Sequence, residues 1–174
     1  MQRHGLGKSL PELWRANLKF SFQNLPAVVN DTFYPLLWAQ ERYLVLKGGR
    51  GSGKSVFIPQ KMTYRLLTEP GHKFGVFRRY RKWLPQSCVA EFQSVLDRWK
   101  IDDYFSFNKV DLILTYKETG ASVHFIGLDD HQKIKSFSGM TGAWIEVDVR
   151  TGKAVDIQRI KIVDEELIIG PKDG

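Results

Sequence analysis

The run KGGRGSGKS, over Lys47 to Ser55, constrains the fold of this chain more than any other stretch. From Gly48 to Ser55 it fits the pattern G-x-x-x-x-G-K-[ST] at every fixed position. The short apolar run before it, Arg42 to Lys47, predicts a buried strand. The apolar spacing after it predicts a helix over Lys54 to Thr68. A strand, a glycine-rich loop and a helix in this order predict a P-loop.

Each part of the pattern has a physical role in binding phosphate. Glycines let the backbone curl so that successive N–H groups point inward, with no Cβ in the way. The N-terminus of the following helix adds donors and a favourable dipole. The Lys54 ammonium group would reach the β- and γ-phosphates, and the Ser55 hydroxyl would ligate Mg²⁺. The predicted nucleotide-binding residues are Gly48, Gly49, Arg50, Gly51, Ser52, Gly53, Lys54, Ser55 and Val56.

Strand and helix patterns alternate after the loop. Lys73 to Arg79 predicts a second strand, and Pro85 to Lys100 predicts a helix with its proline near the first turn. Tyr104 to Leu128 predicts two or three strands joined by tight polar turns, and Gly142 to Val149 predicts another strand. We therefore predict an α/β fold, with a largely parallel sheet flanked by helices and an antiparallel insertion.

The C-terminal residues follow a different pattern. Residues 147–174 alternate apolar and polar side chains, with turn residues at Thr151-Gly152 and near Asp164-Glu165, which predicts a β-hairpin-like tail. A chain of 174 residues is ordinary for one domain. We predict a P-loop core over residues 1–146, with an N-terminal arm over 1–41, and the tail as no separate domain.

Basic residues exceed acidic ones, 26 to 19, which gives a formal net charge of +7 and favours polyanionic partners. They are concentrated in RRYRKW, from Arg78 to Trp83, directly after the predicted second strand. The carboxyl ends of strands are where sites in α/β proteins lie. The segment therefore predicts contact with DNA or another phosphate, with a solvated basic turn as the alternative. The candidate contact residues are Arg78, Arg79, Arg81 and Lys82.

Other classes of site and location are disfavoured. The single cysteine, Cys88, excludes an internal disulfide and predicts a small, semi-buried hydrophobic side chain. The acidic run before His131, Asp129-Asp130, favours a structural role over a metal site, because adjacent residues rarely converge on one ion. No segment approaches the roughly 18 apolar residues of a membrane span. We expect no membrane contact and a cytoplasmic location.

Three stretches resemble the ATPase domain of tailed-phage terminase large subunits: RYLVLKGGRGSGKS, FGVFRRYRKWLPQSCVAEFQSVLDRW and FIGLDDHQKIKSFSGMTGAWIE. The resemblance runs from about Val29 to Glu146, and its third stretch is more specific to the family than the P-loop. It implies an ASCE-type P-loop fold, Mg-ATP hydrolysis and double-stranded DNA as the substrate moved. The partners it implies are the portal, the small terminase subunit and further copies of the chain, in the cytoplasm of the host cell.

The resemblance also implies roles for single residues. Arg50 takes the place of a P-loop arginine that stabilises the γ-phosphate, and Glu146 takes the place of the Walker B acid that holds Mg²⁺ through water. The predicted catalytic residues are Arg50, Lys54 and Glu146, and the predicted metal-binding residues are Ser55 and Glu146. The family places a second acid directly after the first. Here that position is Val147, and Asp148 follows it.

This departure leaves the function open between three hypotheses. The first is the ATPase core of a DNA-packaging terminase, truncated and without its nuclease domain. The second is a remnant of a prophage terminase that binds nucleotide without turnover. The third is an unrelated P-loop kinase. The tail is compatible with truncation, a frameshift or a fusion.

Overall fold

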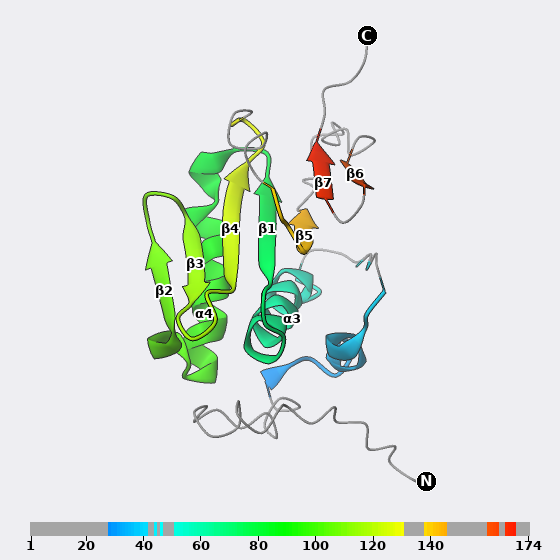
Figure 1. The fold of residues 1–174 in the computed structure, drawn as a ribbon. Coiled ribbons are helices and arrows are strands. Elements are labelled where there is room, and N and C mark those ends of the chain that lie inside the picture. The colour runs from blue at the N-terminus through cyan, green and yellow to red at the C-terminus, as the bar shows by residue number, and fades with distance from the viewer. Residues whose placement is uncertain are drawn as a thin grey trace, which may run out of the picture.

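A five-stranded sheet, in the order β2-β3-β4-β1-β5, gives the molecule its frame (Figure 1). This computed structural model describes residues 28–41, 44, 46, 51–130, 138–145, 160–163 and 166–169. The strands of the sheet are β1 (Lys73–Arg78), β2 (Phe105–Asn108), β3 (Ile113–Tyr116), β4 (Ser122–Gly127) and β5 (Gly142–Ile145). The predicted second strand is confirmed as β1, and the predicted group of two or three strands is confirmed as β2, β3 and β4.

The sheet is mixed rather than largely parallel in its described part. Strand β1 pairs in parallel with β4 and with β5, whereas β3 pairs antiparallel with β2 and with β4. Tight turns join β2 to β3 and β3 to β4, and a tight turn reverses the chain, whereas a parallel pair needs a longer crossover. Gly120, with φ of 73°, lies in the turn before β4. The predicted antiparallel insertion is therefore present, and the ASCE-type classification stays a prediction.

The two main helices form at the expected places, and three short 3-10 helices were not predicted. The main ones are α3 (Lys54–Thr68) and α4 (Ala90–Trp99), and a π-helical turn, η4 (Pro85–Val89), precedes α4. Short 3-10 helices are η2 (Tyr34–Trp38), η3 (Arg81–Trp83) and η5 (Asp102–Tyr104). Helix α3 begins and ends where the sequence predicts. The helix predicted over Pro85 to Lys100 is divided between η4 and α4, and it ends at Lys100 in the left-handed conformation, with φ of 57°.

Both main helices contribute to a core on one face of the sheet, and Figure 1 shows α4 behind the strands. Phe74 of β1 pairs in register with Val123 of β4, and the alternation of a strand puts such pairs on one face. Phe57 of α3 and Phe92 of α4 belong to the same buried cluster. The lone cysteine, Cys88, lies in this cluster as a hydrophobic side chain, as predicted, but it is fully rather than partly buried. A smaller cluster of Phe77, Ile126 and Met140 lies apart from it.

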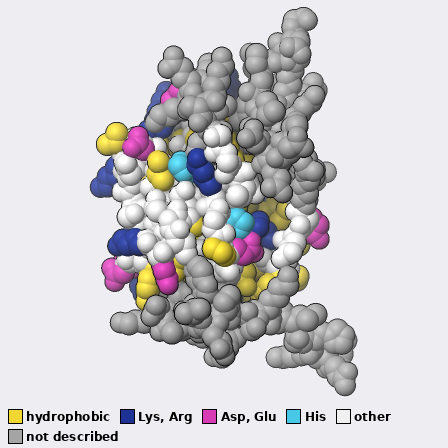
Figure 2. All heavy atoms as spheres, viewed as in Figure 1, with side chains coloured by type: hydrophobic (Ala, Val, Ile, Leu, Met, Phe, Trp, Pro, Cys, Tyr) yellow, Lys and Arg dark blue, Asp and Glu magenta, His cyan; other side chains and the backbone are white. Residues whose placement is uncertain are grey.

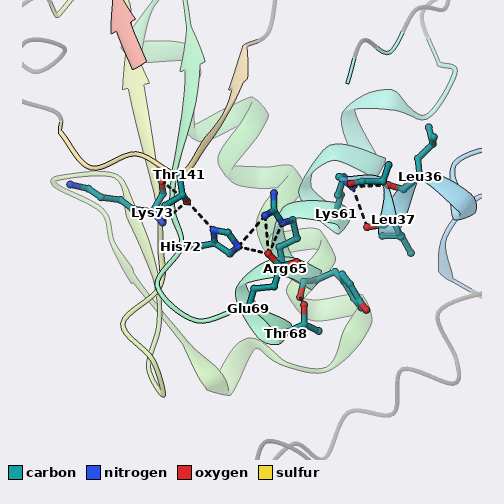
Figure 3. Close-up of polar contacts among 11 residues, drawn as sticks. Leu36, Leu37, Lys61, Arg65, Thr68, Glu69, His72, Lys73 and Thr141 are labelled. Carbon is teal, nitrogen blue, oxygen red and sulfur yellow. Dashed lines mark hydrogen bonds and ion pairs between the residues drawn. The ribbon is translucent and has the colours of Figure 1, made fainter. Parts of the chain in front are cut away.

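Part of the predicted N-terminal arm docks on α3. Lys61 Nζ donates hydrogen bonds to the carbonyl oxygens of Leu36 (2.7 Å), Leu37 (3.2 Å) and Ala39 (2.6 Å), at the C-terminal end of η2 (Figure 3). Burial, and then the nearby charge of Arg65, lowers the pKa of Lys61. An ammonium group at the carbonyl end of a helix also interacts favourably with its dipole. Residues 34–39 and α3 thus form one packed unit.

Several predicted segments lie partly or wholly outside the described residues. Of the strand predicted over Arg42 to Lys47, only Leu44 and Leu46 are described, and neither is in a strand. In the tail, β6 (Ile160–Val163) pairs antiparallel with β7 (Glu166–Ile169), as predicted for a hairpin. The turn predicted at Thr151-Gly152 is outside the described part, and the division into core and tail stays a prediction. Within the described residues, the longest apolar helical stretch falls short of what crossing a membrane requires.

Candidate functional site

The second half of the predicted P-loop is described, and its two glycines have the backbone that the pattern predicts. Gly51 and Gly53 have φ of 79° and 85°, in the left-handed region that suits glycine. A Cβ added at Gly51 would meet no atom within 4 Å, whereas one at Gly53 would lie 3.3 Å from the ring of Phe33. Gly53 is the N-cap of α3, so the loop leads directly into the first turn of the helix. The first turn of a helix presents N–H groups without intrahelical partners.

Polar side chains gather at this turn. Lys54 Nζ donates a hydrogen bond to Ser52 Oγ at 2.7 Å, and Ser55 is exposed. This turn thus brings together one ammonium group and two hydroxyls beside the open side of Gly51, and groups of these types would suit a phosphate and a magnesium ion. Gly48, Gly49 and Arg50 lie outside the described residues, so their predicted roles remain predictions.

Strand β5 leads toward the predicted Walker B acid. It pairs in parallel with β1, with Ile145 opposite Phe77, so both strands end at the same edge of the sheet. Glu146, Val147 and Asp148 come next in the chain and lie outside the described residues. The parallel pairing places Ile145, the last residue of β5, at the edge where β1 ends, which is the edge that carries sites in α/β proteins.

The basic segment after β1 divides into residues with structural contacts and residues on the surface. Arg81 donates its backbone N–H to Asp129 Oδ1 (3.0 Å) and its Nη2 to the carbonyl oxygen of Val110 (2.6 Å). Arg78 is the last residue of β1, and its carbonyl oxygen accepts the N–H of Leu128 at 2.8 Å. Arg79 and Lys82 are exposed. The structure therefore gives the four predicted contact residues two different roles.

The turn after β4 holds the basic segment in place. A Cβ at Gly127 would overlap Asp129 Oδ1 and would lie 2.5 Å from the backbone nitrogen of Arg81. Only glycine allows this approach without a shift of the backbone. Asp129, which the sequence assigned to a structural role, accepts the N–H of Arg81. Within the described part of the chain, no group of three or more histidine, cysteine and acidic side chains is placed to hold a metal ion.

One motif near the basic segment has a local explanation. Asn108 to Asp111, NKVD, fits the [NT]-K-x-D pattern with which GTPases recognise guanine. Its Asn108 Oδ1 accepts the N–H groups of Val110 (2.9 Å) and Asp111 (3.0 Å), and Asn108 Nδ2 donates to Asp111 Oδ2 at 2.9 Å. These bonds close the turn between β2 and β3. We therefore assign the motif to the turn, and ATP stays the predicted nucleotide.

At the edge of the sheet where β1 and β5 begin, a polar network joins α3, β1 and β5 (Figure 3). Arg65 Nη2 donates to Glu69 Oε2 at 2.8 Å, and His72 Nε2 lies 2.6 Å from the same oxygen. His72 Nδ1 lies 2.9 Å from Thr141 Oγ1, and that hydroxyl also accepts the N–H of Lys73 at 3.1 Å. Burial raises the pKa of Glu69, but hydrogen bonds from Arg65 and His72 outweigh it, so this pKa lies below its ordinary value.

The sequence did not predict this network. Arg65, Glu69 and His72 are close in the chain, but Thr141 lies 69 positions after His72, so no local pattern reveals the link between the two strands. The acid–imidazole–hydroxyl order is also found in catalytic triads. Here the hydroxyl is bonded to the backbone of β1, so the arrangement ties β5 to β1.

Charge alone does not mark a site on the face shown in Figure 2. Basic and acidic side chains of the described residues are scattered around that face, between larger areas of uncharged surface. Local grouping of side chains, as in the P-loop and the basic segment, is therefore more informative than the net charge of +7.

Comparison with known proteins agrees with the resemblance seen in the sequence. The model of a family described as phage terminase large subunit matches residues 40–167. The terminase large subunit of Bacillus phage SPP1 is 33% identical over 135 residues, which cover 74% of this chain and 32% of that protein. The chain thus spans about a third of the length of this relative. The family match continues past Glu146, where the resemblance was expected to end.

Proposed function

This chain belongs to the phage terminase large subunit family, and on that premise we propose that it is the ATP-binding, ATP-hydrolysing part of a DNA-packaging motor. The observation that carries the proposal is the turn from Gly51 to Ser55. Two left-handed glycines lead there into a helix whose first residue is Lys54. This arrangement fits the phosphates of a nucleotide.

The residues of the loop have separable roles in the proposal. The Lys54 ammonium group exchanges its Ser52 partner for oxygens of the β- and γ-phosphates, and Ser55 contributes its hydroxyl to Mg²⁺. Arg50 offsets negative charge that develops at the γ-phosphate. Glu146, the next residue in the chain after β5, would hold Mg²⁺ through water. ATP, when bound, supplies the phosphoanhydride bond whose hydrolysis releases the free energy for movement.

The partners follow from the same premise. We propose double-stranded DNA as the polymer that is moved, with the portal, the small terminase subunit and further copies of the chain as protein partners. The site of action is the cytoplasm of the host cell. In this proposal the chain supplies the ATPase core of the motor.

Nucleotide binding is tested by Lys54→Ala, with Lys100→Ala as the control because Lys100 is an exposed lysine at the far end of α4. Saturation at about 100 times Kd stabilises a protein by about 2.7 kcal/mol. We expect Mg-ATP to raise the Tm of the parent and of the control, and to leave the Tm of Lys54→Ala unchanged. A Tm increase of equal size in all three would contradict the P-loop assignment.

Turnover decides between the ATPase and a second candidate, a prophage remnant that binds ATP without hydrolysis. Val147 in place of the second acid is the observation that favours the remnant. Mg-ATPase activity that Glu146→Gln abolishes would support the ATPase. Binding without turnover, with hydrolysis gained on Val147→Glu, would support the remnant. Transfer of the γ-phosphate to a small molecule would instead indicate a P-loop kinase.

A further inference from the structure

We propose that Arg79 and Lys82, held against the rings of Tyr80 and Trp83, form a two-cation contact for the phosphate backbone of double-stranded DNA. We call these four residues the cation–aromatic platform. The inference rests on the proposed function in taking DNA as the polymer that is moved. It goes beyond that function by naming which basic residues contact DNA and which ones only support them.

The contacts of the basic residues separate the two groups. The Arg81 guanidinium group donates to a backbone carbonyl oxygen, that of Val110, at 2.6 Å. Arg79 and Lys82 instead place their charged ends near aromatic rings: Arg79 Cζ is 5.0 Å from the ring centre of Tyr80, and Lys82 Nζ is 5.5 Å from that of Trp83. A ring face attracts a cation but accepts none of its N–H donors in a strong hydrogen bond. Those donors are therefore available to phosphate oxygens.

The rings hold the two cations in one arrangement. Tyr80 and Trp83 meet edge to face, with centres 4.8 Å apart, and Lys82 Nζ also lies 5.9 Å from the centre of the Tyr80 ring. Long basic side chains on a surface otherwise lose rotamer freedom when they bind. Contacts with the rings restrict Arg79 and Lys82 before binding, and this lowers the entropic cost of contacting a phosphate. Trp83 is 43% exposed, so the rings are part of the surface.

Three chain segments fix the base of the platform. The carbonyl oxygen of Arg78 accepts the N–H of Leu128, and Asp129 accepts the N–H of Arg81. The bond from Arg81 to Val110 adds the turn between β2 and β3. The ends of two parallel strands and one hairpin turn therefore position the segment. Residues on so rigid a support lose little free energy on ordering when they bind.

Exposure favours a polymer over the nucleotide as the ligand. Both cations lie on the surface. Exposed basic side chains of this kind contact the phosphate backbone of DNA without regard to its sequence. The excess of seven positive charges in the chain has the sign that a DNA partner requires. The P-loop already supplies the donors that the phosphates of ATP need.

The test measures binding of a short blunt DNA duplex to the full chain by fluorescence anisotropy, between about 50 and 200 mM monovalent salt. The platform variant is Arg79→Gln/Lys82→Gln. The control, Arg98→Gln/Lys100→Gln, removes the same two charges from exposed positions at the end of α4. Trp83→Leu removes a ring and keeps both cations. The change of Tm with Mg-ATP is measured on every variant.

We expect the platform variant to bind the duplex roughly tenfold more weakly per lost contact at about 0.1 M salt. The slope of log K against log salt, which is negative, should become less steep by about 0.9 per lost contact. Trp83→Leu should weaken binding about two- to fivefold with an unchanged slope, since it removes positioning and no phosphate contact. The control pair should bind like the parent.

Equal slopes and affinities for the platform variant and the control would overturn the proposal, as would a parent chain that does not bind the duplex. The Mg-ATP result separates this failure from failure of the proposed function. An unchanged increase in Tm with Mg-ATP, together with an unchanged DNA slope, would reject the platform and leave nucleotide binding intact.

Discussion

The two edges of the β4–β1–β5 part of the sheet use similar side chains in opposite ways. At the amino edge, Arg65, Glu69, His72 and Thr141 bond to one another and to the backbone of β1. At the carboxyl edge, the cations of Arg79 and Lys82 lie against aromatic rings. Polar groups that satisfy one another stabilise a fold, and polar groups with unused donors can bind a ligand. The contacts at the amino edge serve stability, whereas the carboxyl edge carries the cations that we propose bind DNA.

The largest expected effect comes from glycines at the two edges. Gly127→Ala at the carboxyl edge forces a Cβ against the backbone of Arg81, and we expect it to lower the free energy of unfolding by about 3 kcal/mol. At the amino edge, the Cβ that Gly71→Ala adds would meet no atom within 4 Å, so only the φ of 81° is unfavourable for alanine. We expect this substitution to lower the free energy of unfolding by about 1–2 kcal/mol. Urea denaturation measures both. Equal losses would show that Gly127 does not hold the basic segment tightly.

A smaller effect is expected when the amino-edge network loses one hydroxyl. Thr141→Val keeps the shape of the side chain and removes its hydrogen bonds with His72 and with the N–H of Lys73. We expect this to lower the free energy of unfolding by about 1 kcal/mol. Thr115→Val is the control, because the Thr115 hydroxyl forms no hydrogen bond with another described residue. Binding of DNA should be unchanged in both. If Thr141→Val weakened DNA binding as much as stability, the division of roles between the edges would be wrong.

The smallest expected effect is a dependence on pH, from a histidine near the amino edge. Burial, and then the charge of Lys73, lowers the pKa of His124 from 6.5 to about 4. As the pH falls, His124 therefore binds a proton at a higher pH in the unfolded chain than in the folded one. Its contribution to stability is complete above pH 6.5 and is lost as the pH falls toward 4. Solvent partly screens the site, which keeps the effect small.

The measurement is Tm between pH 4 and 7, with His124→Gln as the comparison. Glu69, whose pKa is lowered, contributes stability that is lost only below its ordinary pKa of 4.5, so its effect falls mostly below this range. We expect Tm of the parent to fall more steeply than that of His124→Gln. Parallel curves would mean that His124 is not buried in its neutral form.

Local pattern predicted most of the described fold. The apolar spacing from Lys54 to Thr68 gave both ends of α3, and the polar turns between Tyr104 and Leu128 indicated the antiparallel strands. The π-helical turn at the start of the next helix has no such signal, because η4 and α4 share the apolar spacing that places Val89 and Phe92 in one core.

The site was predicted unevenly, for physical reasons. The left-handed glycines of the P-loop follow from the motif, since each is needed by the backbone at its own position. The different roles of Arg79 and Arg81 depend on where Val110 and Asp129 lie in space, and no spacing within RRYRKW reveals this. The network of His72 and Thr141 is equally nonlocal. Interactions between distant residues are what the linear pattern leaves out.

The bonds from Lys61 determine which N-terminal residues pack as one unit with helix α3. Its ammonium group is held by three carbonyl groups from residues 36–39, and Gln60 Nε2 donates to the carbonyl oxygen of Val28 at 2.8 Å. A chain shortened to start at residue 40 would leave a partly buried charge without these acceptors, on the helix that carries Lys54. A fragment that keeps all of these bonds therefore includes Val28, and residues 28–39 pack against α3 as part of the folded core.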